Sequence, residues 1–238
     1  MINKLTDDLE KKIFYSIVEE YIKRGKPVGS KLLNKTKLYN IPPSTIRFYM
    51  QRLSNKKLIE NVEDNSGRIP TDYGWYYFIK NQFYNELNNK KIKSILDKFK
   101  KNLKKLNPEF PEFSRKLNLI TEEFKIYLLF IKKHKNKTYY FEYGLKSLFK
   151  NYEFIKYKNL IYEALELIDY IKNYDYKIVK YLKPKKINIL IGSYKCLKNF
   201  KNFSILCSYD KINYTFLVSV KRINYPLIYK IFELIVNR

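Results

Sequence analysis

Apolar residues recur at helical spacing near the start of the chain. Ile13 and Ile17 would lie on one face of a helix that begins at Thr6, a residue able to cap the amino end. Gly25 is expected to end this helix. The stretch "KPVGS" then turns the chain, so that Ser30 can cap a short second helix.

The stretch "STIRFYMQRLSNKK" predicts a third helix with two different sides. Ile46, Met50 and Leu53 fall within a narrow arc of the helical wheel and would pack against the neighbouring helices. The opposite side carries Ser44, Phe48, Gln51, Arg52 and Asn55, flanked by Thr45 and Arg47. This helix therefore presents polar, arginine-bearing groups outward.

The next residues, "LIENVEDNSGRIPTDYG", predict strand, turn and strand, and "DYGWYYFIKNQF" returns to helix. Three helices followed by a hairpin are the winged helix-turn-helix plan, in which the third helix enters the major groove of DNA. We expect Gly67 to supply the turn, Pro70 to stiffen the return, and Arg68 to lie at the tip. There Arg68 would reach a phosphate or a narrow groove, the alternative being a solvated turn arginine.

The composition is more typical of a binding protein than of an enzyme. The net charge of +25 favours a polyanionic partner, although residues 1–80 carry only 15 basic and 9 acidic side chains, so most of the excess lies beyond the predicted reading motif. His134 is the only histidine, which argues against a histidine-based metal site, and no phosphate loop or nucleophile motif occurs. We expect no catalytic residue, metal or cofactor. Cys196 and Cys207 lie in strand-like apolar segments and are interpreted as core residues.

The apolar runs are too short for a membrane protein. Stretches such as "YLLFI" and "INILI" are only about five residues long, whereas a span needs roughly 20. The first residues, "MINKLTDDLEKK", contain acids where a signal peptide would need an apolar stretch. The expected location is cytoplasmic.

A second part of the chain follows residue 80. Residues 82–107 predict a long helix with an apolar stripe from Ile92 to Leu106 and many lysines. This helix could pack on the second domain, form a dimer contact, or lie on DNA or a membrane surface. "NPEFPEF" marks a boundary. Toward the end, "INILIGS", "FSILCSYD" and "YTFLVSV" predict three strands, followed by a helix from about Tyr225.

These stretches resemble the HrcA family, the heat-inducible transcription repressors of bacteria. The motifs "PVGS", "TIR" and "SGRIPTDYG" match in order and spacing, and "YGLKSLFKNYEF" with the closing strands matches more weakly. The resemblance implies an α+β protein with a winged helix-turn-helix domain (1–80), a linker helix (81–107) and a GAF-like domain (108–238). It also implies a homodimer that binds an inverted-repeat operator in double-stranded DNA to silence chaperone operons, with the chaperonin GroEL as a partner.

The chain departs from the family in three respects. Family members are commonly longer, and most of their inserted dimerising subdomain is missing here. Phe48 and Tyr49 follow "TIR" where the family usually has Asn and an acid, and Phe48 could press on a thymine methyl group but cannot form a bidentate bond to adenine. Pro42 occupies the position of the family's capping serine, so the cap is lost or moves to Ser44.

The sequence therefore predicts one set of DNA-binding residues. They are Ser44, Thr45, Arg47, Phe48, Gln51, Arg52 and Arg68. The alternative function is that of a non-enzymatic module without operator specificity, which binds the chaperonin or nucleic acid in general.

Overall fold

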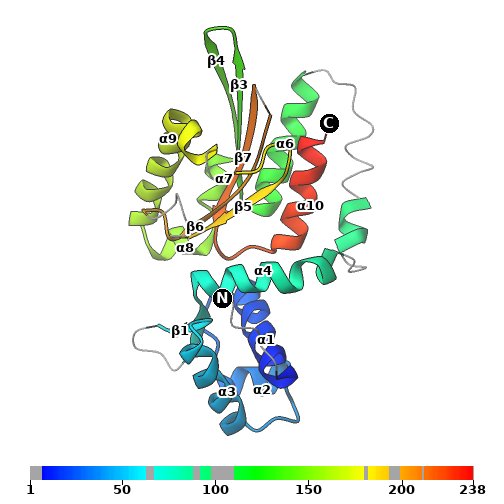
Figure 1. Ribbon diagram of the computed structural model, residues 1–238, viewed down its shortest axis with the longest axis vertical. Coiled ribbons are helices and arrows are strands. Elements are labelled where there is room, and N and C mark those ends of the chain that lie inside the picture. Colours follow the sequence, from blue (N-terminus) through cyan, green and yellow to red (C-terminus); the bar gives the residue numbers. More distant parts are fainter. Residues whose placement is uncertain are drawn as a thin grey trace. The chain divides into compact units, whose positions relative to one another are not determined.

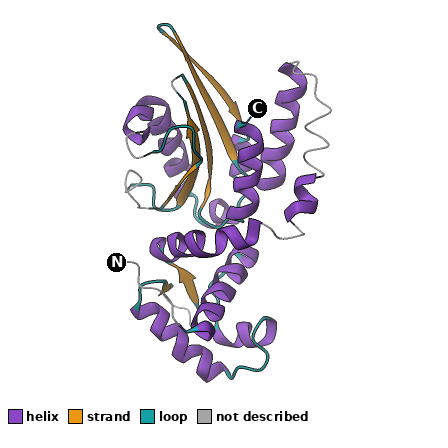
Figure 2. Ribbon diagram, turned by 45° about the vertical axis from the view of Figure 1, so that its right-hand side comes forward, coloured by secondary structure: helices purple, strands orange, loops and turns teal. Residues whose placement is uncertain are grey.

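The structure, a computed structural model, describes residues 7–62, 67–87, 92–97, 110–179, 182–192, 199–210 and 212–237. The chain divides into two compact units, Met1–Tyr84 and Asn85–Arg238. Figures 1 and 2 show helices in both units and a large sheet in the second, so the predicted α+β class is confirmed. No helix in the described ranges is long and apolar enough to cross a membrane.

The first unit follows the predicted order of three helices, a hairpin and a further helix. Its elements are α1 (Asp8–Arg24), α2 (Ser30–Thr36), α3 (Pro43–Asn55), β1 (Ile59–Asn61), β2 (Arg68–Pro70) and α4 (Asp72–Leu87). The strands β1 and β2 are antiparallel. The apolar arc of α3 is buried as expected, with Ile46, Met50 and Leu53 inside.

The amino end of α1 differs from the prediction, whereas its other end agrees. Asp7 is the capping residue, and its carboxylate accepts hydrogen bonds from the N–H groups of Leu9 and Glu10. The predicted cap, Thr6, lies outside the described residues. An aspartate can satisfy two free N–H groups at once and its charge suits the helix dipole, which explains the one-residue shift. Gly25 ends the helix in the left-handed region, with φ 66°.

The caps of α2 and α3 are weaker than predicted. Ser30 is the first residue of α2, the capping position belongs to Gly29, and no side chain makes a cap hydrogen bond there. Pro42 occupies the capping position of α3, again without a side-chain hydrogen bond, so this cap is lost and does not move to Ser44. Proline fixes a backbone angle suited to the helix start, which compensates in part.

Aromatic side chains hold α1 to α4. The rings of Phe14 and Tyr77 meet edge to face with centroids 5.6 Å apart, and Tyr15 and Phe78 meet in the same way at 6.1 Å. Trp75 is buried beside these rings. Edge-to-face pairs add roughly 0.5–1.5 kcal/mol each beyond the burial of their area.

Two glycines of "SGRIPTDYG" are required by close approach of the backbone. A Cβ on Gly67 would lie 2.6 Å from the Cβ of Pro27, and one on Gly74 would lie 2.0 Å from the carbonyl oxygen of Leu58. The turn predicted at Gly67 falls largely on residues 63–66, which lie outside the described residues, so this part stays a prediction. The structure gives Gly67 a further role, because it lets the hairpin pack directly on the "PVGS" segment.

The second unit is built on an antiparallel sheet of five strands in the order β4-β3-β7-β6-β5. Its described elements are α6 (Phe110–Phe124), β3 (Tyr127–His134), β4 (Lys137–Tyr143), α7 (Leu145–Leu148), α8 (Tyr152–Lys156), α9 (Asn159–Val179), β5 (Asn188–Ile191), β6 (Phe203–Tyr209), β7 (Asn213–Val220) and α10 (Tyr225–Val236). The three predicted strands and the last helix are confirmed. In Figure 1, α9 lies on one face of the sheet, and α6 and α10 lie on the other.

Alternation along the strands divides the core of this unit between the two faces. Leu129 and Ile131 of β3 belong to the cluster that packs against α9, whereas Leu128 between them is buried on the opposite face. Cys207 is buried in the α9 cluster, which confirms its interpretation as a core residue. Cys196 lies outside the described residues.

A bidentate ion pair joins two segments of the second unit that are far apart in the sequence. The Nε of Arg222 donates to Oε1 of Glu153 at 2.6 Å, and its Nη2 donates to Oε2 at 3.2 Å. Both side chains are largely shielded, and their planar groups match in geometry. The pair fixes the start of α10 relative to α8.

The predicted linker helix, 82–107, lies largely outside the described residues. Residues up to Leu87 continue α4, and residues 92–97 are helical. Ile92 and Leu96 are buried, which favours a helix packed against protein over one whose apolar side is exposed at these positions.

We expect Gly74→Ala to destabilise the first unit by about 2 kcal/mol or more, because the methyl group would overlap a backbone oxygen. Alanine favours helices by about 1 kcal/mol over glycine, so the clash must exceed that gain. Gly29→Ala is the matched control, since a Cβ there meets nothing within 4 Å. Its effect should stay within about 1 kcal/mol, because alanine caps a helix less well than glycine but loses less backbone entropy on folding. Chemical denaturation of both variants tests this, and equal stability would contradict it.

Candidate nucleic-acid interface

The outward side of α3 is an exposed polar surface interrupted by one aromatic ring. Ser44, Arg47, Phe48 and Gln51 are exposed, and Thr45 is half-buried. The amide nitrogen of Gln51 donates to the side-chain oxygen of Asn55 at 3.2 Å, one turn further along. The structure thus brings five of the seven predicted residues onto one side of one helix.

Arg47 is connected to the second helix. Its Nη1 donates to the hydroxyl of Ser30 at 3.5 Å. This serine belongs to the "PVGS" segment, for which the sequence predicts a turn and a helix cap but no contact with the third helix. The guanidinium keeps its other N–H groups available on an exposed side chain.

Arg68 is connected to the same segment through its backbone. Its N–H donates to the carbonyl of Val28 at 3.0 Å, and the N–H of Val28 donates back to Arg68 at 2.9 Å. Arg68 also pairs with Asn61 across the hairpin, so it is the first residue of β2 and not the tip of the turn. The predicted position at the tip is therefore corrected to the first residue of β2, where two sets of backbone hydrogen bonds hold this residue. Its side chain is half-exposed.

Arg47 and Arg68 are therefore attached to one short stretch, 28–30, although 21 positions separate them in the sequence. Nothing in the local pattern of either residue reveals this link. Residues 28–30 therefore position strand β2 and the arginine of α3 relative to each other.

Arg52 is placed differently from the other predicted residues. Its guanidinium lies 3.7 Å from the carboxylate of Asp7 and 3.6 Å from that of Glu10, both at the start of α1. It also lies over the rings of Tyr49 and Phe48, at 5.4 Å and 5.9 Å from their centroids. These contacts hold the charge of Arg52 toward α1.

A buried carboxylate completes this connection between α1 and α3. Glu10 is fully buried, and the ammonium of Lys56 donates to its Oε2 at 2.6 Å. A buried charge is tolerated only when paired, so removal of Lys56 would leave the Glu10 carboxylate with only the more distant guanidinium of Arg52 as a partner. The pair fixes the orientation of α3 relative to α1.

The Tyr49 hydroxyl also donates a hydrogen bond to the carboxylate of Asp7, and this bond shifts the pKa of both groups. Partial burial acts to raise the pKa of Asp7. The hydrogen bonds from Tyr49, Glu10 and Leu9 and the charge of Arg52 outweigh it, so the pKa is lowered from 3.8. The same hydrogen bond and partial burial raise the pKa of Tyr49.

Sequence reasoning missed several residues of this region. Tyr39 is 71 % exposed in the turn before α3, and its only sequence signal is an aromatic residue within the polar, proline-rich stretch "LYNIPP". Tyr49 and Lys56 could not be found from their neighbours, since their partners lie more than forty positions away. No cluster of three or more metal-binding side chains occurs within the described ranges.

The chain is similar to curated bacterial proteins that share one name. It is 27 % identical over 198 residues to the heat-inducible transcription repressor HrcA of Thermodesulfovibrio yellowstonii, covering 80 % of this chain and 53 % of that protein. The same-named protein of Staphylococcus saprophyticus is 31 % identical over 121 residues, covering 50 % of this chain and 37 % of that protein. The protein of Natranaerobius thermophilus is 39 % identical over 70 residues, 29 % of this chain and 20 % of that protein.

These matches leave much of each relative uncovered. The chain spans about half the length of the Thermodesulfovibrio protein and less of the other two. No family model matches the chain. A crystal structure of a hypothetical protein superposes with a TM-score of 0.71, covering 98 % of this chain and 96 % of that one, at 19 % identity. That likeness supports the fold alone.

We expect acid to weaken the attachment of α3 to α1. Because the pKa of Asp7 is lowered by folding, its carboxylate stabilises the folded state above pH 3.8, and this stabilisation is lost as the pH falls below that value. Thermal unfolding from about pH 5.5 to 3 should show the advantage of the wild type over Asp7→Asn shrinking below about pH 4.

Asp8→Asn is the matched control for this experiment, because it removes the same charge one position away from an almost fully exposed side chain. Its melting curve should follow that of the wild type. Parallel curves for the wild type and Asp7→Asn across the acid range would contradict the role assigned to the Asp7 carboxylate.

Proposed function

This chain is HrcA-like, and from that premise we propose that it is a sequence-specific DNA-binding repressor of heat-shock (chaperone) operons. It acts in the cytoplasm as a homodimer on an inverted-repeat operator. The observation that carries the proposal is the common attachment of Arg47 and Arg68 to the stretch 28–30, because it supports a single basic surface built from two elements. Binding is reversible occupancy of DNA and involves no chemistry or cofactor.

The first unit acts in this proposal as a winged helix-turn-helix domain. α3 is the recognition helix and lies in the major groove, and the β1–β2 hairpin is the wing. Ser44 and Thr45, at the amino end of α3, approach the DNA backbone, where exposed hydroxyl and N–H groups bind phosphate oxygens. Arg47 and Gln51 face base edges, since guanidinium and amide groups can form two parallel hydrogen bonds with guanine and adenine respectively.

Phe48 gives this recognition surface an apolar centre. The ring is 60 % exposed and lies between Arg47 and Gln51 on the outward side of α3. It offers contact to a thymine methyl group, which discriminates less than a bidentate hydrogen bond. Tyr39, in the turn before α3, can donate from its hydroxyl to a phosphate.

Arg52 is a positioning residue in this scheme. Its contacts with Asp7 and Glu10 already occupy the guanidinium, so its contribution to DNA binding passes through the orientation of α3. Lys56, paired with the buried Glu10, acts in the same way. A helix held by buried ion pairs meets the groove at a fixed angle, which reduces the entropy lost on binding.

The second unit is proposed as a reduced GAF-like domain that supports assembly. The inserted dimerising subdomain of the family is largely missing, so the dimer contact must use what remains. Binding of the chaperonin GroEL belongs to this unit as well. Its residues carry most of the net positive charge of the chain, and all residues proposed to contact DNA lie in the first unit, so this charge is available to another partner.

An exposed apolar surface of the second unit offers a dimer contact, and we call it the α8–α9 surface. Its members are Tyr152, Ile155, Tyr157, Tyr162 and Leu165, which are 38–72 % exposed. A patch of this kind is rare on a monomer and common at interfaces. The alternative stripe from Ile92 to Leu106 is less suited, because Ile92 and Leu96 are already buried.

Charges around the α8–α9 surface are complementary between two copies. Lys156 and Lys158 are exposed at one end, whereas Glu166 and Asp169 are exposed along α9, and residues 159–171 contain no lysine or arginine. A two-fold axis through the apolar centre brings the lysines of one copy to the acids of the other.

The alternative function is a non-enzymatic module that binds the chaperonin or nucleic acid without operator specificity. A competition experiment distinguishes the two. A labelled duplex carrying the inverted repeat, enriched by selection from a random library, is displaced by unlabelled repeat or by a scrambled duplex. The proposed function requires the repeat to compete at least a thousandfold better than the scrambled duplex. Equal displacement would support the alternative.

Arg47→Ala and Arg68→Ala should weaken DNA binding in different ways. Loss of a base contact by Arg47→Ala should cost about 1–3 kcal/mol on the operator and relax preference at one base pair. Loss of a phosphate contact by Arg68→Ala should weaken binding to all duplexes and reduce the slope of log K against log salt by about one. Fluorescence anisotropy at several salt concentrations measures both effects.

Arg115→Ala is the matched control for these two variants. It removes an exposed arginine of α6 in the second unit, outside the proposed DNA-binding surface, so affinity and salt dependence should not change. If Arg68→Ala behaved like this control, Arg68 would be a solvated arginine without a role in binding.

The dimer should form without DNA through the α8–α9 surface. Sedimentation at micromolar concentration should show the wild type as a dimer and the double variant Ile155→Lys, Tyr162→Lys as a folded monomer, since four buried charges per interface oppose association. The matched double variant Leu119→Lys, Ile212→Lys changes two other exposed apolar residues and should remain dimeric. A wild type that is monomeric until operator is added would contradict the prediction.

A further inference from the structure

One face of the sheet in the second unit is only partly covered. The register places Phe130 of β3 opposite Phe141 of β4 and Thr215 of β7, and the next row along the same face holds Lys132 and Asn213. Ile131, between the two rows, points to the α9 cluster, so these five side chains lie on the face away from α9.

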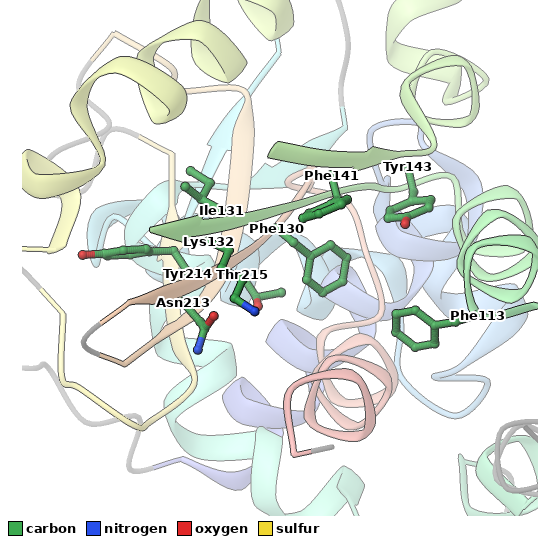
Figure 3. Close-up of a pocket in the computed structure, with 9 residues that line it drawn as sticks. All are labelled: Phe113, Phe130, Ile131, Lys132, Phe141, Tyr143, Asn213, Tyr214 and Thr215. Atoms are coloured by element: carbon green, nitrogen blue, oxygen red, sulfur yellow. The ribbon is translucent and has the colours of Figure 1, made fainter. Parts of the chain in front are cut away.

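A cavity of about 210 Å³ lies against these two rows (Figure 3). Phe113 of α6 closes one side, and Phe130, Phe141 and Tyr143 form the apolar wall. Each of these four rings is half-buried, so solvent still reaches part of every one. Convergent aromatic rings around a concave space are typical of small-molecule sites.

The aromatic wall is fixed before any ligand arrives. The rings of Phe130 and Tyr143 meet edge to face at 5.9 Å. The hydroxyl of Tyr143 lies 3.1 Å from the hydroxyl of Ser114 and shares a hydrogen bond with it, which ties β4 to α6. A rigid wall lowers the entropy that a ligand must offset on binding.

The charge of the cavity selects an anion. Lys132 is the only cationic group among the nine residues that line it, and no carboxylate is among them. Among the described residues, none pairs with the Lys132 ammonium, which lies on an exposed side chain. Asn213 and Thr215 add polar groups on the same side as Lys132.

We propose that this cavity binds a small aromatic anion, a one- or two-ring aryl carboxylate. The ring fills the space between Phe113, Phe130 and Phe141, and the carboxylate meets Lys132 at the open edge. An apolar cavity of about 150 Å³ holds benzene, so 210 Å³ suits one ring or two fused rings. The site lies in the second unit and does not depend on the proposed DNA binding.

The test uses 2-naphthoate as the probe and the full chain as the protein. Calorimetric titration should give saturable binding with one site per chain. The dissociation constant should be about 1 mM, as expected for so small a ligand. The neutral analogue 2-naphthylmethanol should bind about fivefold more weakly because it lacks the charge that meets Lys132. Equal affinities would overturn the anion preference.

Three variants locate the site. Lys132→Gln should weaken 2-naphthoate about fivefold and leave 2-naphthylmethanol unchanged. Lys133→Gln makes the same change at the next residue, which faces the other side of β3, and should have no effect on either probe. Thr215→Phe should fill the cavity, abolish binding of both probes and leave the melting temperature within a few degrees of the wild type.

Two outcomes would overturn the proposal. The first is the absence of saturable binding up to about ten times the expected dissociation constant. The second is binding that survives in folded Thr215→Phe, because the probe would then occupy another part of the surface. Loss of operator binding in the experiments on the first unit would leave this proposal intact, since the titration does not involve DNA.

Discussion

The close approach between the hairpin and the "PVGS" segment is the constraint on which the first unit depends. The backbone of Val28 pairs with that of Arg68, and Pro27 packs where a side chain on Gly67 would otherwise lie. This pairing adds a third strand-like segment to a hairpin whose two strands have only three residues each. Two such short strands alone would be marginal in water, so the added segment gives the hairpin its stability.

The same constraint determines where the functional groups lie. Val28 is two positions from Ser30, which receives the hydrogen bond from Arg47. The hairpin and α3 are therefore aligned through one short segment, while the ion pair of Glu10 and Lys56 aligns α3 with α1. A buried pair of this kind contributes little net stability compared with an apolar pair, but it penalises other arrangements of the helices.

Local patterns predicted the elements of the first unit, and they could not predict contacts between distant residues. The apolar arc of α3 repeats every three or four residues, so Ile46 and Met50 reveal their burial without any tertiary information. The cap at Asp7 and the packing of Gly67 on Pro27 could not be predicted, because the first is decided by competition with Thr6 and the second by a distant partner. Pro27 lies forty positions from Gly67, and no periodicity links them. The motif that resembles the HrcA family includes Gly67 and Gly74, but the resemblance gives no physical reason for either glycine.

The candidate site divides in the same way. Ser44, Arg47, Phe48 and Gln51 follow from helical spacing, whereas the attachment of Arg52 to α1 needs the folded structure. In the second unit, the cavity combines Phe113, the hairpin of β3 and β4, and the start of β7, three segments separated by as much as one hundred residues. The strand register places these side chains on one face of the sheet, and a shift of one residue would turn them to the other face. The sequence alone does not fix the register, so it could not predict the cavity.

The anchoring of the hairpin at its base has a consequence for how such proteins diverge. Gly67 and Arg68 are held by contacts with Pro27 and Val28 of the "PVGS" segment. Insertions or deletions between Asn61 and Gly67 would therefore leave the arginine in place while altering how far the loop extends. Loop length tolerates change because each doubling adds only about 0.6 kcal/mol of closure entropy. In the proposed function, the reach of the loop along the DNA can therefore evolve, or be engineered, independently of Arg68, the residue proposed to contact phosphate.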